Sequence, residues 1–219
     1  MVSPQELKSS LQSGLAALDL SLNEVQQNQL LAYLRLLDKW NQAYNLSGIK
    51  DVSQMVNYHL LDSLAIASFI EGNIILDVGT GAGLPGIPLA ISFPEKQFLL
   101  LDSNGKKTRF LFQVKTELGL DNVAIFHDRV ENFHCPQQID IVLCRAFAAI
   151  GQFIEKTSHI LSENTRLLVM KGQYPDEELA ELPAAFEMTK SLELIIPGVD
   201  GSRHLLEIGR VDSSASNER

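Results

Sequence analysis

The chain has 219 residues, 45% of them hydrophobic and 21% charged, and its formal net charge is −9 at pH 7. This composition is typical of a globular protein that is long enough to bury a large core. Two cysteines are too few for a disulfide framework or a cysteine zinc site, and the sequence has neither a signal-peptide pattern nor an apolar run long enough to span a membrane, so we expect a cytoplasmic protein that binds no metal.

The negative charge is unevenly distributed along the chain. Residues 1–71 hold 4 basic and 7 acidic side chains, residues 72–171 hold 10 of each, and residues 172–219 hold 4 and 10. An acidic chain argues against a nucleic-acid partner. Because the central region is neutral, a local basic surface is still compatible with the composition there.

Three helices are expected in the first third of the chain. Ser3 and Glu6 form the pattern of a capping box around a proline. A second capping box at residues 21–24 precedes apolar residues at helical spacing, and a third helix begins at Asp51. We therefore expect an N-terminal helical extension over residues 1–73.

After this extension the pattern changes to alternating strands and helices, which predicts a parallel sheet. The expected strands are 74–78, 97–101, 123–127, 139–144 and 166–170, and the expected helices are 86–92, 106–118 and 150–160.

Two apolar runs near the C-terminus, residues 192–197 and 204–209, are joined by glycine and polar residues at 198–202. This pattern predicts a hairpin. The sheet should therefore have seven strands, mostly parallel, and end in an antiparallel hairpin. We expect an α/β, Rossmann-like domain over residues 74–211 and a disordered tail over residues 212–219.

The first expected strand is followed by a glycine loop and a helix, which is a common site for a nucleotide-like cofactor. Gly79, Gly81 and Gly83 stand at alternate positions, where a Cβ would keep the backbone away from a ligand. The segment from Gly81 also matches the G-x-G-x-x-G pattern of dinucleotide sites, and Asp102 follows at the separation typical of that motif.

Two details favour S-adenosylmethionine (SAM) over a dinucleotide. Asp77, at the corner between strand and loop, would repel a pyrophosphate but attract the ammonium group of SAM. Pro85 and Pro88 remove backbone donors that a diphosphate would use. The closing hairpin is also typical of seven-stranded, Rossmann-like SAM-dependent methyltransferases. A dinucleotide site and a purely structural glycine turn remain as alternatives.

Ligands of such sheets bind beyond the C-terminal ends of the strands. Asp102 ends the second strand and is expected to accept hydrogen bonds from the ribose hydroxyls; the alternative is a helix cap. Val130 and Glu131 follow the third strand, and we expect them to contact the adenine amino group. A solvated turn is the alternative for this segment.

The end of the fourth strand is expected to face the methyl acceptor. Arg145 is the candidate residue there, with an exposed salt bridge as the alternative. Cys144 lacks the preceding proline of cytosine methyltransferases and alternates to the opposite face from Arg145, so we expect a structural role. His59 is interpreted as a core histidine, with a contribution to the acceptor side as the alternative.

Basic residues open the helix after the second strand. Lys106, Lys107 and Arg109 stand in its first turn, where cations oppose the helix dipole. We expect this cluster to bind an anionic partner such as RNA, with a solvated cluster as the alternative. Lys171, at the end of the fifth strand, is expected to reach a phosphate or to be solvated.

These features together resemble the RsmG (GidB) family of bacterial methyltransferases, which modify a guanine N7 in small-subunit rRNA. The matching segments span most of the chain: Lys39-Trp40-Asn41 with Tyr44-Asn45-Leu46, His59-Leu60-Leu61-Asp62-Ser63, Asp77 to Pro88, Leu101-Asp102-Ser103 with Gly105-Lys106, Arg129-Val130-Glu131, Arg145-Ala146-Phe147-Ala148, Lys171-Gly172, and Asp200-Gly201 with Arg203-His204. Cys144 departs from the serine that is usual in the family.

The resemblance implies SAM as the cofactor and guanine 527, in the 530 loop of 16S rRNA, as the acceptor. It implies cofactor contacts at Gly79, Leu84, Val130, Glu131 and Arg145. The implied partner is 16S rRNA or the small ribosomal subunit, and we expect a monomer.

An attack by guanine N7 requires no general base, because this atom carries a lone pair and no proton. We expect Arg145 to hold guanine O6 or a neighbouring phosphate. Three other functions remain open: a methyltransferase for a protein or small molecule, an NAD-dependent oxidoreductase, and a SAM-binding module without catalysis.

Overall fold

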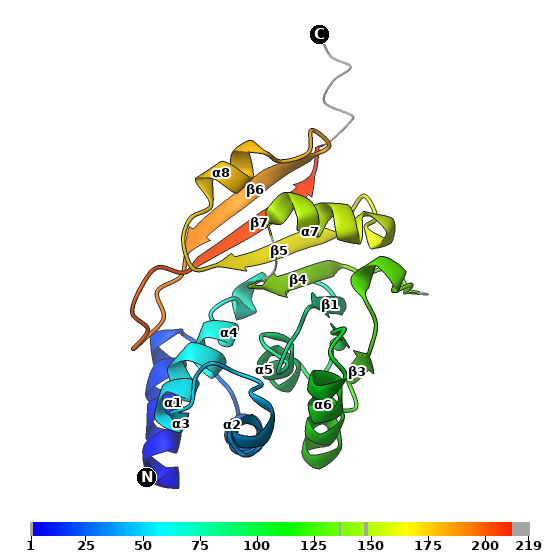
Figure 1. Ribbon diagram of the computed structural model, residues 1–219. Coiled ribbons are helices and arrows are strands. Elements are labelled where there is room, and N and C mark those ends of the chain that lie inside the picture. The colour runs from blue at the N-terminus through cyan, green and yellow to red at the C-terminus, as the bar shows by residue number, and fades with distance from the viewer. Residues whose placement is uncertain (1, 136, 147–148, 212–219) are drawn as a thin grey trace.

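The computed structural model describes residues 2–135, 137–146 and 149–211. The tail predicted at residues 212–219 lies outside these ranges. The strands are β1 (Ile74–Val78), β2 (Gln97–Leu101), β3 (Val123–Phe126), β4 (Ile141–Arg145), β5 (Arg166–Lys171), β6 (Phe186–Glu193) and β7 (His204–Arg210). They form one sheet in the order β3-β2-β1-β4-β5-β7-β6, with β7 antiparallel to β5 and β6 (Figure 1).

The helices follow the predicted alternation with the strands. They are α1 (Pro4–Ala17), α2 (Glu24–Tyr44), α3 (Val52–Met55), the π-helix η1 (Val56–Leu61), α4 (Asp62–Leu64), the 3₁₀-helix η2 (Ala67–Phe69), α5 (Gly86–Ser92), α6 (Gly105–Leu118), the 3₁₀-helix η3 (Val130–Asn132), α7 (Ile150–Thr157), the 3₁₀-helix η4 (Ser158–Ile160) and α8 (Asp176–Ala180). None of these described helices is both long and apolar enough to cross a membrane.

The seven-stranded sheet with its antiparallel hairpin is confirmed. β1, β2 and α5 begin and end where the sequence predicted, and β3, β4, β5 and α6 differ by one or two residues, which is usual for element boundaries. The helix predicted over residues 150–160 consists of α7 followed by η4.

The hairpin has a different first strand from the one predicted. β6 occupies residues 186–193 and not 192–197. It is the edge strand, and all but its first residue are exposed, so it lacks the apolar alternation that marks a half-buried strand. Leu194 and Ile196, which produced the apolar run, lie beyond the strand and are buried in the same hydrophobic cluster as the N-terminal helices.

The N-terminal helices begin close to the predicted positions. Ser3 and Glu6 form the predicted capping box of α1. The box of α2 lies two residues later than predicted, because Asn23 and not Ser21 is the N-cap and Gln26 completes the box. The third predicted helix is divided into α3, η1, α4 and η2, and the π-helical turn of η1 lies in its middle.

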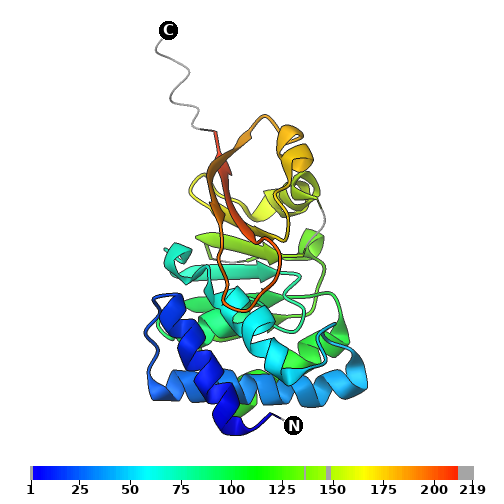
Figure 2. The ribbon, with the colours of Figure 1, turned by 90° about the vertical axis from the view of Figure 1, so that its left-hand side faces the viewer.

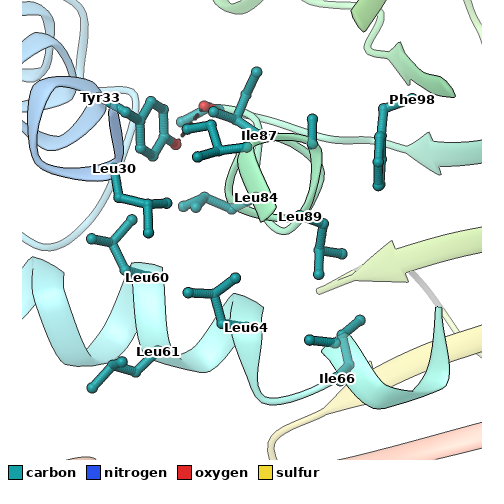
Figure 3. Close-up of a cluster of buried hydrophobic side chains, with 14 of the residues drawn as sticks. Leu30, Tyr33, Leu60, Leu61, Leu64, Ile66, Leu84, Ile87, Leu89 and Phe98 are labelled. Carbon is teal, nitrogen blue, oxygen red and sulfur yellow. Dashed lines mark hydrogen bonds between the residues drawn. The ribbon is translucent and has the colours of Figure 1, made fainter. Parts of the chain in front are cut away.

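The two faces of the sheet bury alternate residues of the strands. Ile75 of β1 belongs to the cluster formed with α2, α5 and α6, whereas Leu76 and Val78 belong to the cluster formed with α7. Figure 3 shows how side chains from α2, η1, α4 and α5 meet in the first cluster. Residues 1–73 therefore share a hydrophobic core with the sheet.

Figure 2 shows the N-terminal helices grouped at one side of the sheet, with the β6–β7 connection reaching down to them. Two hydrogen bonds join this connection to η1. The Asn57 side chain donates to the Gly198 carbonyl (3.5 Å), and the Tyr58 hydroxyl accepts from the Asp200 amide (3.3 Å). The loop after β6 is thereby held beside the C-terminal ends of β4 and β5.

Candidate active site

Three backbone amides of the glycine loop after β1 donate to groups at the end of β2. The amides of Gly79 and Thr80 donate to the Leu101 carbonyl at 2.8 and 3.1 Å. The Gly81 amide donates to the Asp102 carboxylate at 2.9 Å. These three donors are therefore engaged within the protein, whereas a dinucleotide site would direct such amides at a pyrophosphate. This geometry argues against the dinucleotide alternative.

Asp77 lies beneath the loop and is fully buried. Its Oδ2 accepts hydrogen bonds from the Thr80 hydroxyl (2.7 Å) and from the Gly86 amide (2.9 Å). Among the residues that the structure describes, Oδ1 has no hydrogen-bond partner. Burial raises the pKa of Asp77 to about 6, and the two hydrogen bonds oppose this shift.

A second contact holds the loop from the N-terminal region. The hydroxyl of Tyr33, a buried residue of α2, donates to the Ala82 carbonyl at 2.8 Å. Gly83 stands next in the loop with φ of 92°, and a Cβ there would come within 2.5 Å of Ile87. The loop conformation therefore depends on contacts from α2, β1 and α5.

A cavity of about 500 Å³ lies beside this loop, within the roughly 300–1,000 Å³ that is usual for small-molecule sites. We call it the first cavity. It is lined by the last residues of β1 and β2, by the segments after β1, β2, β3 and β4, by one residue of α6 and by two residues of α7: Val78, Gly79, Leu101, Asp102, Ser103, Lys107, Asp128, Arg129, Val130, Glu131, Ala146, Gln152 and Lys156.

Four of the predicted cofactor residues line the first cavity: Gly79, Asp102, Val130 and Glu131. The other four do not. Asp77, Gly81 and Leu84 support the cavity from beneath or beside it, and Leu84 is buried in the hydrophobic cluster with the N-terminal helices. Arg145 lies in a neighbouring cavity.

Asp102 connects the glycine loop to α6. Its Oδ2 accepts from the Gly81 amide, and its Oδ1 accepts from the Asn104 amide at 2.8 Å. The N-cap of α6 is Asn104, which accepts from the Lys106 amide, so Asp102 is not the helix cap of the alternative interpretation. The Asp102 carboxylate lies at the cavity wall, with Lys107 Nζ 3.5 Å away.

The segment after β3 forms the opposite wall. Glu131 makes an ion pair with Lys156 of α7, and this lysine holds the pKa of Glu131 below its usual range. Val130 is buried at the start of η3. The Glu131 side chain therefore has a partner and is not merely solvated.

A second cavity, of about 380 Å³, lies on the other side of the β4 end. It is lined by residues of η1 and α4, the ends of β4 and β5, and the start of β7: Ile49, Tyr58, His59, Asp62, Arg145, Ala146, Met170, Lys171, Gly172, Leu194, Arg203 and His204. Ala146 lines both cavities, so they adjoin at the residue after β4.

The second cavity contains a buried carboxylate between two arginines. Asp62 Oδ2 lies 2.7 Å from Arg145 NH1, and its Oδ1 lies 3.0 Å from Arg203 Nε. Arg145 therefore forms a salt bridge, as the alternative interpretation had it. The salt bridge lies in the wall of a cavity and not on the open surface. Sequence reasoning did not assign roles to Asp62 and Arg203, although Asp62 is a carboxylate among the apolar residues of its helix.

His59 is buried yet lines the second cavity. Its Nδ1 donates to the Tyr58 carbonyl at 3.0 Å, and its Nε2 accepts from the Ser47 hydroxyl at 2.7 Å. Burial and the nearby Arg145 charge lower the pKa of His59 to about 4, so the ring is neutral at pH 7. Both ring nitrogens are occupied by these bonds.

The predicted basic residues are divided between several places. Lys106 and Arg109 are exposed at the start of α6, whereas Lys107 lines the first cavity. Lys171 lies in the second cavity, where Glu178 of α8 binds it at 2.8 and 2.9 Å. It is therefore neither solvated nor a free cation.

Cys144 is buried in the cluster with α7, on the opposite face of β4 from Arg145. Burial raises the pKa of its thiol, which keeps it protonated and unreactive at pH 7. The expected structural role agrees with this position.

The first cavity fits the chemical groups of SAM. The buried Oδ1 of Asp77 is a carboxylate oxygen without a partner, which suits a cationic ligand near the loop. The Asp102 carboxylate at the wall suits a ribose diol, and Gly79, with φ of 68° and no Cβ, allows close approach. Within the described parts of the chain, no group of three or more His, Cys, Asp or Glu side chains could hold a metal ion.

Residues 26–206 match the model of the GidB family, described as rRNA small subunit methyltransferase G. The chain is 52% identical over 202 residues to ribosomal RNA small subunit methyltransferase G of Marinobacter nauticus, covering 92% of this chain and 94% of that protein. It is 49% identical to the protein of the same name from Pseudomonas syringae, covering 96% and 99%.

Among solved structures, a SAM-dependent O-methyltransferase from Thermotoga maritima is similar in fold, with a TM-score of 0.52 and 18% identity. The match covers 68% of this chain and 64% of that chain. Such low identity indicates a shared fold and no more.

Replacing Asp77 by alanine should weaken SAM binding by at least about a hundredfold. The change removes the carboxylate that sets the path of the glycine loop through Thr80 and Gly86. A hundredfold loss of affinity corresponds to about 2.7 kcal/mol. Titration calorimetry with SAM measures the effect. Asp140→Ala is the matched control, because Asp140 also holds two backbone amides, at the other end of β1. Wild-type affinity in Asp77→Ala would contradict the prediction.

Both the stability of the protein and its affinity for SAM should depend on pH through the ionisation of Asp77. The folded-state pKa of Asp77, about 6, exceeds its ordinary value of 3.8, so the contribution of this group to the free energy of unfolding falls as the pH rises between these values. A cationic ligand favours the ionised form, and SAM affinity should therefore rise through pH 6. Asp77→Asn should remove both dependences, and their persistence would mean that another group titrates.

Proposed function

The chain belongs to the GidB family, described as rRNA small subunit methyltransferase G, and we propose from its two cavities that it methylates N7 of a guanine. Membership makes it a SAM-dependent methyltransferase of 16S rRNA. The proposal concerns the atom that is methylated and the residues that achieve this.

The observation that carries the proposal is the position of Ala146 in the wall of both cavities. SAM occupies the first cavity and the target base occupies the second, so the donor and acceptor groups meet beside this residue. When bound, SAM supplies a methyl group on a sulfonium; attack by a nitrogen lone pair forms an N–C bond while the electrons of the S–C bond return to sulfur. The protein must hold the acceptor nitrogen in line with that bond at about 3 Å.

The chemistry of the second cavity favours an acceptor that has no proton to lose. His59 is neutral and both of its ring nitrogens are hydrogen-bonded. Asp62 is engaged with two guanidinium groups. Neither of these two side chains is free to act as a general base, and the other histidine of the lining, His204, packs edge-on against Tyr174. Guanine N7 needs no general base, whereas an exocyclic amine would have to lose a proton.

We assign the cofactor contacts to Gly79, Asp102, Val130 and Glu131, which line the first cavity. Asp77, Gly81 and Leu84 belong to the same site as supporting residues of the glycine loop. Arg145 is the proposed catalytic residue, because it lies one residue from the shared wall at Ala146. Its guanidinium holds the target nucleotide through guanine O6 or a phosphate and leaves the N7 lone pair free.

The proposal extends to the biological setting. The protein acts as a monomer in the cytoplasm on 16S rRNA, either free or within the small ribosomal subunit. Residues 74–211 form the methyltransferase domain, and residues 1–73 are a helical extension. Of the four predicted RNA-binding cations, the exposed Lys106 and Arg109 contribute to RNA binding, whereas Lys107 and Lys171 are paired with Asp102 and Glu178.

Incubation with methyl-labelled SAM and 16S rRNA tests the function itself. Label should enter the RNA, and strand cleavage after reduction and aniline treatment, which is selective for 7-methylguanosine, should occur at one guanine. Reactions without RNA are the control. Label in protein or in a small molecule, or methylated RNA that resists this cleavage, would contradict the proposal.

RNA binding by the exposed cations of α6 should appear in its salt dependence. Each phosphate contact contributes about 0.7–0.9 to the slope of log affinity against log salt concentration. The double variant Lys106→Ala, Arg109→Ala should therefore lower the slope for 16S rRNA by up to about 1.8 and leave SAM affinity unchanged. Lys107 is left intact because it contacts Asp102.

The matched control for this variant is the double change Lys190→Ala, Arg210→Ala. Both cations lie on the hairpin, over the rings of Phe69 and Phe186. This control should retain the wild-type slope. If the α6 variant also retains it, the cluster is a solvated helix start.

Arg145→Lys and Arg145→Ala should remain folded but lose at least about tenfold in the rate of methyl transfer, or roughly 1.4 kcal/mol of transition-state stabilisation. Lysine lacks the fixed fork of donors that arginine presents. Single-turnover methylation at saturating SAM measures the rate, and melting curves check folding. The control is Arg166→Lys, since Arg166 pairs with Glu207 at the opposite end of the sheet. A wild-type rate in Arg145→Ala would leave only the salt bridge as its role.

A further inference from the structure

The π-helical turn of η1 brings three residues to the second cavity. Tyr58 and His59 lie within η1, and Asp62 is the first residue of α4. All three line the cavity. π-helical turns in α-helices frequently lie at functional sites, because the wider turn changes which residues face a neighbour. The turn therefore points to a role for the one carboxylate among these three residues.

Asp62 is the shared partner of two arginines that come from distant parts of the chain. Its two oxygens lie 2.7 Å from Arg145 NH1 and 3.0 Å from Arg203 Nε. Only 4% of its side chain is exposed. Arg145 ends β4, whereas Arg203 immediately precedes β7. One carboxylate thus fixes the separation of two guanidinium groups on different elements.

Each arginine keeps part of its donor fork for a ligand. Arg145 uses NH1 for Asp62 and the Tyr58 carbonyl, and Arg203 uses Nε for Asp62 and NH1 for the Ser202 carbonyl. Within the described parts of the chain, no hydrogen bond involves the NH2 group of either arginine. Both side chains are about one quarter exposed and line the cavity.

The charge of this group favours an anion. Two guanidinium groups share one carboxylate, which leaves one positive charge, whereas the nearby Lys171 is neutralised by Glu178. A phosphate group accepts hydrogen bonds from two guanidinium groups in a defined orientation. The base of the same nucleotide can then lie against the other lining residues, among them Tyr58 and His59.

We propose that Asp62 is a positioning residue, which holds Arg145 and Arg203 as a pair that binds one phosphate of the RNA beside the target guanine. The proposal rests on the proposed function. Asp62 touches neither the base nor the cofactor and acts through the two arginines. Without it the cations remain, but their separation is no longer fixed.

The test separates positioning from binding. Asp62→Asn should lower kcat for 16S rRNA methylation at least about tenfold at saturating SAM, while the KM for SAM and the affinity for RNA without SAM stay within about twofold of wild type. The matched control is Glu207→Gln, because Glu207 is also a carboxylate paired with an arginine, Arg166, far from both cavities. This control should keep the wild-type kcat.

A double-mutant cycle with Arg203→Ala distinguishes positioning from a general structural role. It measures whether the effect of Asp62→Asn on kcat depends on the presence of Arg203. If Asp62 acts through Arg203, Asp62→Asn should cost less than about threefold once Arg203 is alanine. Arg203→Lys covers the case in which Asp62→Asn does not fold, because it retains the charge and removes the fork. It should lower kcat at least about tenfold and leave the salt dependence of RNA binding unchanged.

The possible results distinguish a failure of the proposed function from a failure of the positioning role of Asp62. A wild-type protein that leaves 16S rRNA unmethylated contradicts the proposed function. A wild-type protein that methylates it, together with a folded Asp62→Asn at wild-type kcat or with effects that multiply independently in the cycle, overturns the role of Asp62 alone. Wild-type kcat in Arg203→Lys also overturns it.

Discussion

The buried carboxylate of Asp77 is the constraint on which the rest of the site depends. Its hydrogen bonds to Thr80 and Gly86 join the end of β1 to the start of α5 and so set the path of the glycine loop between them. Tyr33 holds the same loop from α2. Because a buried charge is costly unless it is compensated, this arrangement is stable only with those donors in place. The second oxygen of Asp77 is buried and has no hydrogen-bond partner among the described residues.

The positions of the two cavities follow from the order of the strands in the sheet. β4 is central, so the residues after it have the ends of β1 on one side and of β5 on the other. Ala146 therefore separates a cavity suited to SAM from one that carries cations for RNA. The N-terminal helices contribute to both, since α2 supports the glycine loop while η1 and α4 supply one wall of the second cavity. The second cavity holds Arg145, Arg203 and Lys171 with two carboxylates, so it is locally basic within a chain of net negative charge.

The sequence predicted what short-range patterns encode. β1, β2 and α5 lie where apolar runs and glycines indicated, and Gly79, Asp102, Val130 and Glu131 line the first cavity because strand ends converge in a parallel sheet. It failed for β6, whose exposed side chains carry no alternation. The pairing of Asp62 with Arg203 spans 141 residues and depends on tertiary packing, so no local pattern indicated it. Lys171 and Glu178 are only seven residues apart, but their contact depends on the turn before α8.

If donor and acceptor meet at Ala146, a crystal structure of the protein with S-adenosylhomocysteine and guanosine 5′-monophosphate will show both ligands beside this residue. We expect the thioether sulfur beside Ala146 in the first cavity, and the guanine in the second cavity with its phosphate on Arg145 and Arg203. A nucleotide bound elsewhere, or a sulfur that points away from the second cavity, would contradict this expectation.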